Sequence, residues 1–280
     1  YKRSRDDPYR DYGTAGLLRA VGGVANDIQT GFDTATYTCV DYAVRDFLPD
    51  EVADNADEVL ELASQITKFL TTVLEFDFDR RLLKTELVAA NLTDTTFTLA
   101  SAPSGGQIEA ATPANRFIQR AVNFANIAVV RANAMMGVSH MIMSADVAQR
   151  IAATEEIADT VKHNVGESFV IQGGWQGPNY GLPPNLYGKK VVVVPHSENT
   201  AKKNQTASFS DMLTDNIIFL HVAAAGRRTR NAITTFRKDG MIVRSYRDEP
   251  RKGQYIEVEM IQDETLTNVN GAYLETDALT

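Results

Sequence analysis

Apolar residues recur at spacings of three and four between residues 55 and 88, which is the spacing of one face of an α-helix. The positions are Val59, Leu62, Ala63, Ile66, Phe69, Leu70, Val73 and Leu74. The same pattern continues through Phe76 to Leu87 and Val88. A helix of more than about thirty residues is well beyond the average globular helix. We therefore predict one long amphipathic helix over 55–88 that organises the fold around it.

A second helical pattern follows Thr112 and Pro113, a capping residue and a proline suited to the first helical position. Its apolar positions are Phe117, Ile118, Ala121, Val122, Phe124, Ala125, Ala128 and Val129. The apolar segment 138–143 then predicts a buried strand. Ser144 follows it and is placed to cap a further helix over 145–153. This part of the chain is therefore predicted to run helix, strand, helix.

Short apolar or alternating runs in the later part of the chain predict β-strands. They lie at 190–194, 216–222, 233–236, 241–246 and 256–260. The turn residues Lys238-Asp239-Gly240 indicate that the third and fourth of these strands form a hairpin. The last run alternates apolar and acidic residues, which predicts one buried face and one solvated face.

The first 54 residues show weaker patterns. Residues 1–35 are mixed in charge, dotted with glycine and without a sustained period. Two interpretations stay open for them, an arm that needs a partner surface or a disordered terminus. Residues 36–44 are rich in β-branched and aromatic side chains, and Pro49 follows them. We expect a strand or a hairpin arm in that segment.

Composition and charge narrow the function classes. The chain has 280 residues, of which 44% are hydrophobic, so it can bury a core in one or two domains. The net charge of -8 argues against a dedicated nucleic-acid binder, because neutralising phosphates requires a basic surface. Cys39 is the only cysteine, which excludes an intrachain disulfide and cysteine-rich metal sites. No apolar run is long enough for a membrane span or a signal-peptide core.

Residues suited to catalysis are few. The four histidines are His140, His163, His196 and His221. They lie in or near apolar strands or at exposed positions, so ordinary packed or surface histidines are the favoured interpretation. The sequence has no G-x-S-x-G elbow, no phosphate-binding loop ending in G-K-[ST], and no H-E-x-x-H pair. We therefore predict a protein that is not an enzyme, with no catalytic, cofactor-binding or metal-binding residues.

Two other segments could be interpreted as binding sites, one for phosphate and one for a cation. The glycine-rich segment 173–177, which contains Trp175, lacks the strand-to-helix setting of a phosphate loop, so a mobile surface loop is favoured. Asp77 and Asp79 suggest a cation site or a pair of catalytic carboxylates, but two carboxylates supply fewer oxygens than metal ions normally require. A solvated helix face is the favoured interpretation of this pair.

Charge is also segregated along the chain. An acidic block contains Asp50, Glu51, Asp54, Asp57, Glu58 and Glu61. A basic stretch contains Arg227, Arg228, Arg230, Arg237, Lys238, Arg244, Arg247, Arg251 and Lys252. Opposed blocks of this kind can pair between neighbouring copies and fix their orientation. The alternative, two independent solvated faces, stays open.

Three stretches, in order, carry a family resemblance. Residues 138–148 combine a buried strand with a polar-capped helix, and residues 186–195 lead from an aromatic-glycine turn into a valine-rich strand. Residues 255–274 form an alternating segment that closes with Gly271-Ala272-Tyr273. In this order they resemble the major capsid proteins of tailed bacteriophages with the Hong Kong 97-type (HK97-like) fold, and the likeness runs over most of the chain.

The resemblance implies an α+β fold with an N-terminal arm, an extended loop, a peripheral domain with a long spine helix, and an axial domain. Carried onto this sequence, 1–35 is the arm and 36–54 the extended-loop region. Residues 55–91 and 226–280 form the peripheral domain, and 92–225 the axial domain. The extended-loop region is short, so the lysine-to-asparagine cross-link of one branch of the family is not carried over.

The resemblance also implies a structural function. The subunit would self-assemble into pentamers and hexamers of an icosahedral head that encloses double-stranded DNA. Its partners would be other copies, scaffolding, portal and decoration proteins, and packaged DNA bound non-specifically; no membrane is involved. It would be located in the virion after assembly in the host cytoplasm. Two alternatives stay open, the shell protein of an encapsulin-type bacterial nanocompartment and, more distantly, an α/β ligand-binding protein or enzyme.

Overall fold

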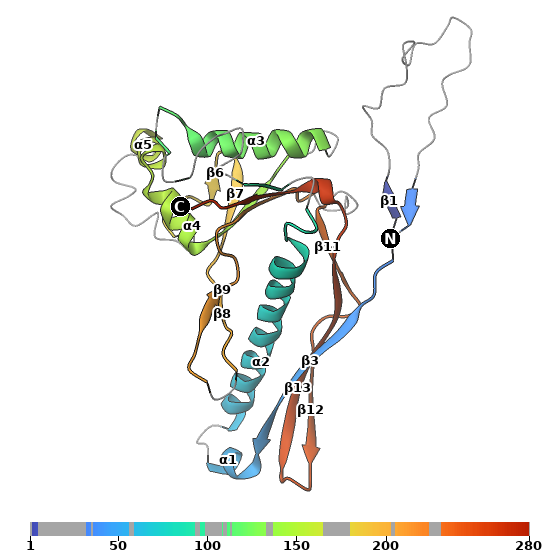
Figure 1. Ribbon diagram of the computed structural model, residues 1–280. Helices are drawn as coiled ribbons and strands as arrows, with labels where there is room; N and C mark the ends of the chain where they lie inside the picture. The colour runs from blue at the N-terminus through green and yellow to red at the C-terminus, as the bar shows by residue number, and fades with distance from the viewer. Residues whose placement is uncertain are drawn as a thin grey trace, which may run out of the picture. The chain divides into compact units, whose positions relative to one another are not determined.

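A computed structural model describes residues 2–4, 32–34, 36–55, 59–92, 96–98, 108, 111–112, 114–132, 137–164, 180–202, 205–223 and 231–279 (Figure 1). The chain divides into two compact units. The helix–sheet unit consists of Tyr37–Val88 and Ile233–Leu266. The six-stranded unit consists of Ala89–Ala232 and Thr267–Thr280, and Tyr1–Thr36 is grouped with it.

The helix–sheet unit is organised around one long strand, β13 (Gly253–Leu266). Three strands pair with it, all antiparallel: β3 (Val40–Pro49), β11 (Ile233–Arg237) and β12 (Ile242–Asp248). Figure 1 shows the helix α2 (Val59–Arg81) lying along this sheet. Leu70 and Leu74 of α2 are buried with Ile256, Val258 and Met260 of β13. The buried face predicted for 256–260 is confirmed, since the even-numbered residues are turned towards the helix, but the predicted solvated face is wrong at Glu259, which is also buried.

The long helix predicted over 55–88 is confirmed only in its central part. The helix α1 (Asp50–Asn55) precedes α2, and a π-helical turn (Leu82–Glu86) follows Arg81. The wider turn is closed by a hydrogen bond from the Leu87 N–H to the Leu82 carbonyl. Such turns interrupt α-helices locally, and apolar periodicity alone does not predict them.

The hairpin predicted at Lys238-Asp239-Gly240 is wrong. Strands β11 and β12 both pair antiparallel with β13, so they run in the same direction and not against each other. Arg237 lies opposite Gln262, whereas Ile242 lies opposite Glu259, so residues 238–241 interrupt one edge of the sheet. The turn residues therefore form a bulge between β11 and β12, because both strands pair with the longer strand β13 and not with each other.

The six-stranded unit contains a mixed sheet in the order β4-β14-β10-β5-β7-β6. Its strands are β4 (Thr96–Thr98), β5 (His140–Ser144), β6 (Asn185–Leu186), β7 (Lys189–Val194), β10 (Ile217–Leu220) and β14 (Ala272–Thr276). The pairs β4–β14 and β5–β7 are parallel, and the other pairs are antiparallel. The strands predicted at 138–143, 190–194 and 216–222 are confirmed.

The described residues of this unit include the helices α3 (Phe117–Ala132), α4 (Ala145–Ala153) and α5 (Glu155–Asn164). Ser144 caps α4 as predicted, because its hydroxyl accepts a hydrogen bond of 3.3 Å from the Val147 N–H. The predicted start of α3 at Thr112 and Pro113 is wrong, since the helix begins at Phe117. Pro113 itself lies outside the described residues.

Glu156 replaces the predicted cap at the start of α3. Its carboxylate accepts hydrogen bonds of 2.9 Å from the N–H groups of both Ile118 and Gln119. The Tyr187 hydroxyl donates a third bond of 2.6 Å to the same carboxylate. An acidic group at a helix N-terminus satisfies orphan amides and interacts favourably with the helix dipole. Glu156, which is 2% exposed, thereby fastens α3 to α5 and to the segment before β7.

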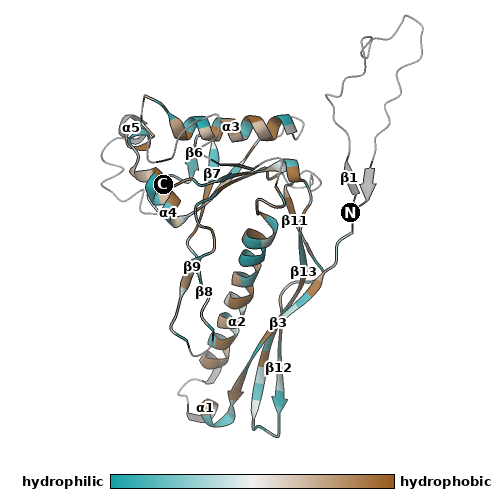
Figure 2. Ribbon diagram, viewed as in Figure 1, coloured by the Kyte–Doolittle hydropathy of each residue, from teal (hydrophilic) through white to brown (hydrophobic). Residues whose placement is uncertain are grey.

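The smaller sheets are two antiparallel pairs, β1 (Lys2–Ser4) with β2 (Phe32–Thr34), and β8 (Ser197–Asn199) with β9 (Phe209–Asp211). A 3₁₀ turn (Val269–Gly271) leads into β14. Figure 2 shows hydrophilic residues gathered towards the end of β12. No helix among the described residues combines the length and apolar character needed to cross a membrane.

The observed units differ from the predicted domain boundaries in two places. Residues 36–54 were expected as an extended loop, but β3 is a fully paired strand of the four-stranded sheet and α1 follows it. The closing segment was expected with the peripheral domain, but β14 pairs with β10 and β4 in the six-stranded sheet. Both segments therefore belong to the sheet whose strands they pair with, and these strands are distant in sequence.

Candidate interaction surface

Two of the four histidines, His140 and His221, take part in structural hydrogen bonds. Nδ1 of His140, on β5, lies 2.8 Å from the Ser139 hydroxyl. That hydroxyl donates to the Leu220 carbonyl and accepts from the Val222 N–H, so it connects β5 to the end of β10. Burial, and after it the charge of Lys190, lowers the pKa of His140. The ring is therefore neutral near pH 7 and joins a chain of bonds that holds two strands together.

His221 also takes part in a structural hydrogen bond. Nδ1 of His221 lies 2.7 Å from the Gly137 carbonyl, which only accepts, so this nitrogen carries the proton. His196 lies between β7 and β8, and the side chain of His163 lies outside the described residues. In the part of the chain that the structure describes, no group of three His, Cys, Asp or Glu side chains is placed to hold a metal ion.

Several predicted candidates fall outside the described residues. These are the segment 173–177 with Trp175, the basic residues Arg227, Arg228 and Arg230, and the acidic residues Asp57 and Glu58. Their interpretations stay predictions.

The sequence favours a solvated helix face for Asp77, but the structure places its carboxylate in a network of ion pairs. It pairs with Arg81 one turn later, and Arg81 also donates bonds of 3.3 and 3.1 Å to the two carboxylate oxygens of Glu264. The Arg81 guanidinium lies 3.6 Å from the ring centre of Tyr42, on β3. Burial is the largest single effect and lowers the pKa of Arg81, but the hydrogen bond to Glu264 and the charges of Glu264 and Asp77 together outweigh it, so the pKa of Arg81 is above its usual value. This network fastens the end of α2 to the sheet.

The acidic and basic blocks meet within one chain. Asp50, at the start of α1, accepts bonds of 3.3 and 2.9 Å from the guanidinium of Arg247 on β12. Arg244 pairs with Glu259 at 2.7 Å, and Arg237 donates to Gln262. The sequence leaves two interpretations of these blocks open, pairing between copies and independent solvated faces. Neither interpretation included ion pairs within one chain. Three of the basic side chains are therefore already held within the sheet.

The outer face of the four-stranded sheet, turned away from α2, is the candidate interaction surface. Successive side chains of a strand alternate between the two faces. Since Val44 and Val258 pack against the helix, their neighbours point outward. The outer residues form two rows across the strands: Phe47, Tyr255 and Tyr246 in one, Arg45, Glu257 and Arg244 in the other. We refer to these six residues as the outer rows.

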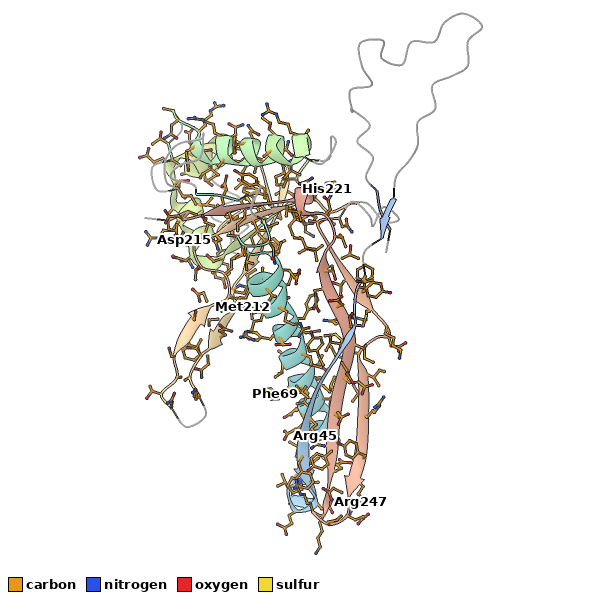
Figure 3. All side chains as sticks on the ribbon, turned by 45° about the vertical axis from the view of Figure 1, so that its right-hand side comes forward. Arg45, Phe69, Met212, Asp215, His221 and Arg247 are labelled. Atoms are coloured by element: carbon orange, nitrogen blue, oxygen red, sulfur yellow. The ribbon has the colours of Figure 1, made fainter. Side chains whose placement is uncertain are left out.

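The outer rows are joined by contacts between side chains. Arg45 donates a 3.0 Å bond to the Tyr246 hydroxyl, which donates a 3.0 Å bond to Glu257. The Arg45 guanidinium also lies 4.8 Å from the ring centre of Tyr255. Phe47 and Tyr246 pack against the two sides of Tyr255, with ring centres 5.0 and 5.4 Å away. Figure 3 shows Arg45 on this sheet, with Arg247 nearer its end.

This arrangement suits contact with another protein. The side chain of Arg244 is 56% exposed and Tyr246 is 40% exposed, although both are held in place by neighbours. Tyrosine and arginine are enriched at protein interfaces, and side chains already held in one conformation lose less entropy on binding. Sequence reasoning missed these rows because β3 and β12 are about 200 residues apart. Alternation along β3, where Asp41, Ala43 and Arg45 are exposed, was the available signal.

Comparisons with known proteins show the fold. No family model and no curated protein matches the chain. A phage-related protein from Bordetella bronchiseptica is similar in structure, with a TM-score of 0.64 and 15% identity, covering 90% of this chain and 80% of that one. A structure from Mycobacterium phage Che8 has a TM-score of 0.58 and 13% identity, covering 100% and 84%.

The capsid structure of the cyanophage P-SCSP1u is similar over 100% of this chain and 83% of its own, with a TM-score of 0.57 and 12% identity. At such low identities the likeness concerns the course of the backbone. The chain therefore has the HK97-like α+β fold, as the sequence resemblance predicted.

Proposed function

We propose that this chain is the major capsid protein of a tailed bacteriophage, a structural subunit that assembles into the pentamers and hexamers of an icosahedral head. The observation that carries the proposal is a fold shared over the whole described architecture with a solved phage capsid. In such a shell, each subunit buries modest interfaces and closed symmetry makes their sum large. The proposed role is mechanical and requires no catalytic residue.

We assign the two compact units to the two domains of that fold. The helix–sheet unit is assigned as the peripheral domain, with α2 as its spine helix. The six-stranded unit is assigned as the axial domain, which meets its copies around the capsomer centre. These boundaries follow the observed strand pairing and modify those predicted from the sequence.

The outer rows are proposed to contact a neighbouring subunit in the shell. Arg45 to Glu reverses a charge at the centre of this surface without touching the buried core. We expect the concentration needed for assembly to rise about tenfold or more, since repulsion at an interface costs more than the loss of one pair. The melting temperature of the free subunit is expected to fall by only a few degrees, because the position is exposed but the new carboxylate lies opposite Glu257 and loses the bond to Tyr246.

The matched control is Arg150→Glu on α4, another exposed arginine, with a side chain that is 57% exposed. Assembly can be followed by light scattering across a concentration series for both variants. Equal assembly of Arg45→Glu, Arg150→Glu and the parent chain would remove the outer rows from the interface.

The remaining partners are proposals as well. Packaged DNA is expected on the inner face without sequence preference, and scaffolding, portal and decoration proteins are expected during assembly. The expected location is the virion, after assembly in the host cytoplasm. The net charge of -8 is compatible with lining a DNA compartment but not with tight DNA binding.

Electron microscopy of the purified, recombinantly expressed chain tests the proposal. We expect closed shells or rings of five or six subunits, with or without a scaffolding partner supplied. Particles recovered from infected or producing cells are expected to protect DNA from nuclease. Protein cargo in place of DNA would favour the nanocompartment alternative, and a uniform monomer or dimer under all conditions would refute the shell function.

A further inference from the structure

Glu275 is a carboxylic acid in the apolar core of the six-stranded unit. It lies on β14, and its residue is 0% exposed. Neither of its carboxylate oxygens has a hydrogen-bond partner among the described residues. Buried carboxylates are normally paired with a cation or bound by several donors, because an isolated buried charge costs many kcal/mol. Glu275 therefore needs a physical explanation of its own.

The surroundings of Glu275 are a small apolar cavity. Its volume is about 10 Å³, which is at the lower limit for one water molecule. Phe117, Ile118 and Val122 of α3 line it, and α4, β5 and β10 contribute only apolar side chains. The surface of this cavity is entirely apolar, so a charged carboxylate beside it would have neither a hydration shell nor a hydrogen-bond partner among the described residues. The neutral, protonated acid is the form that the cavity accommodates.

Ionisable groups near Glu275 do not offset the burial. Tyr273, two residues earlier on the same strand, is the one such group that interacts with it electrostatically among the described residues, and its charged form is negative. The cavity walls on α3, α4, β5 and β10 carry no ionisable side chain. Burial alone raises the pKa of Glu275 to about 8. Near pH 7 the acid is therefore mostly protonated in the folded unit.

At Glu275 the strand pairs with Ile217 of β10 and Phe97 of β4, and further on the Ile108 N–H donates a 3.4 Å bond to the Ala278 carbonyl. The parallel partner β4 is only three residues long. Beyond β14, the chain is fastened by Asp215, whose carbonyl accepts from the Ala278 N–H at 3.1 Å and whose carboxylate accepts from the Leu279 N–H at 2.6 Å. Detachment of residues 275–279 would break these bonds and the pairing of Glu275 with Ile217 and Phe97, and would bring the Glu275 side chain into water while residues 272–274 stay paired with β10.

We propose that Glu275 makes the C-terminal strand a proton-dependent latch: β14 stays docked while the carboxyl group is protonated in its cavity, and its end detaches when the group ionises in water. The latch links solvent pH to a local opening of the six-stranded unit. Such local openings are a normal part of protein stability, and a single buried group can dominate their pH dependence.

The sign of the effect follows from the two pKa values. In the detached state Glu275 has an ordinary pKa near 4.5, and in the docked state a pKa of about 8. Below pH 4.5 both states are protonated and pH has no effect. Between about pH 5 and pH 8 the detached state loses a proton that the docked state keeps, so the opening equilibrium rises about tenfold per pH unit. Above pH 8 the dependence levels off.

Hydrogen exchange on the full-length chain tests the latch. Amide exchange in residues 275–279 is measured from pH 5 to pH 9 and corrected for the intrinsic pH dependence of exchange. We expect protection to fall about tenfold per unit between pH 5 and pH 8 in the parent chain. Glu275→Gln, which removes the ionisation, is expected to abolish that slope. The matched control Glu155→Gln, at an exposed position on α5, is expected to keep it.

A second measurement needs no variant. The carboxyl carbon of Glu275 is followed by NMR titration in the unassembled parent chain, and it is expected to titrate near pH 8. Titration near pH 4.5, or exchange protection that does not change with pH in the parent chain, would overturn the latch. An unchanged slope in a folded Glu275→Gln variant would also overturn it. These outcomes do not depend on whether the chain forms a shell.

Discussion

Replacing Arg81 by methionine is expected to lower the stability of the helix–sheet unit by about 3 kcal/mol, because removing one partner of a buried pair leaves the other charge unpaired. The side chain of Glu264 is only 5% exposed. The guanidinium of Arg81 donates one hydrogen bond to each carboxylate oxygen of Glu264. The variant also loses the contact of the guanidinium with the Tyr42 ring. Thermal unfolding measured by circular dichroism should show a melting temperature about 10 °C lower.

Two further variants separate this mechanism from a general loss of helix packing. Lys68→Met removes an exposed cation from the same helix and is expected to leave the melting temperature within about 2 °C of the parent. Adding Glu264→Gln to Arg81→Met removes the unpaired carboxylate charge. The double variant should therefore recover roughly half of the decrease in melting temperature. If the double variant melts no higher than Arg81→Met alone, the ion pair is not the cause.

Glu156→Ala is expected to have a similarly large effect on the six-stranded unit. The substitution leaves three donors without their acceptor: the Ile118 and Gln119 N–H groups and the Tyr187 hydroxyl. Each buried donor left unsatisfied costs about 1 kcal/mol or more, so a total of about 3 kcal/mol is expected. Denaturant unfolding is expected to show a lower midpoint, and hydrogen exchange should show reduced protection in the first turn of α3.

Glu155→Ala is the matched control, because Glu155 precedes Glu156 in the same helix but is exposed. We expect it to change the free energy of unfolding by less than about 0.5 kcal/mol. Glu156→Gln keeps an acceptor oxygen and is expected to fall between the two alanine variants. A stable Glu156→Ala variant with a fully protected α3 would show that water or another group takes over the cap.

Local rules predicted those parts of the fold that depend on neighbouring residues. The Ser144 cap and the helix after it follow from a serine placed one turn before a buried valine. The apolar periodicity of α2 and the alternation of β13 likewise report which face is buried. These patterns are short in range, so one sequence is sufficient to read them.

Features that depend on distant pairing were missed. Glu156 caps a helix whose first residues lie 38 positions earlier, and no local pattern marks it as anything but an acidic first turn of α5. Lys238-Asp239-Gly240 has the composition of a hairpin turn, but β13 provides a longer partner for both flanking strands. In the sequence, Glu275 cannot be told from any exposed acidic residue of an alternating strand. Its burial depends on α3, which is more than 140 residues earlier in the chain.

The family resemblance supplied what local rules did not. The order of the strand-and-helix segment 138–148, the valine-rich strand after Gly188 and the closing segment 255–274 predicted the HK97-like fold that the structural comparisons show. The candidate surface was not predictable in the same way. Its rows exist only because Arg45 of β3 and Tyr246 of β12 meet across β13.

The mass of the purified chain in solution tests the shell function most directly. Native mass spectrometry or light scattering reports the number of 30.8 kDa chains in each particle. The proposed function predicts species containing five or six chains and closed shells built from them. A single species of one or two chains, unchanged by concentration or by a scaffolding partner, would contradict it.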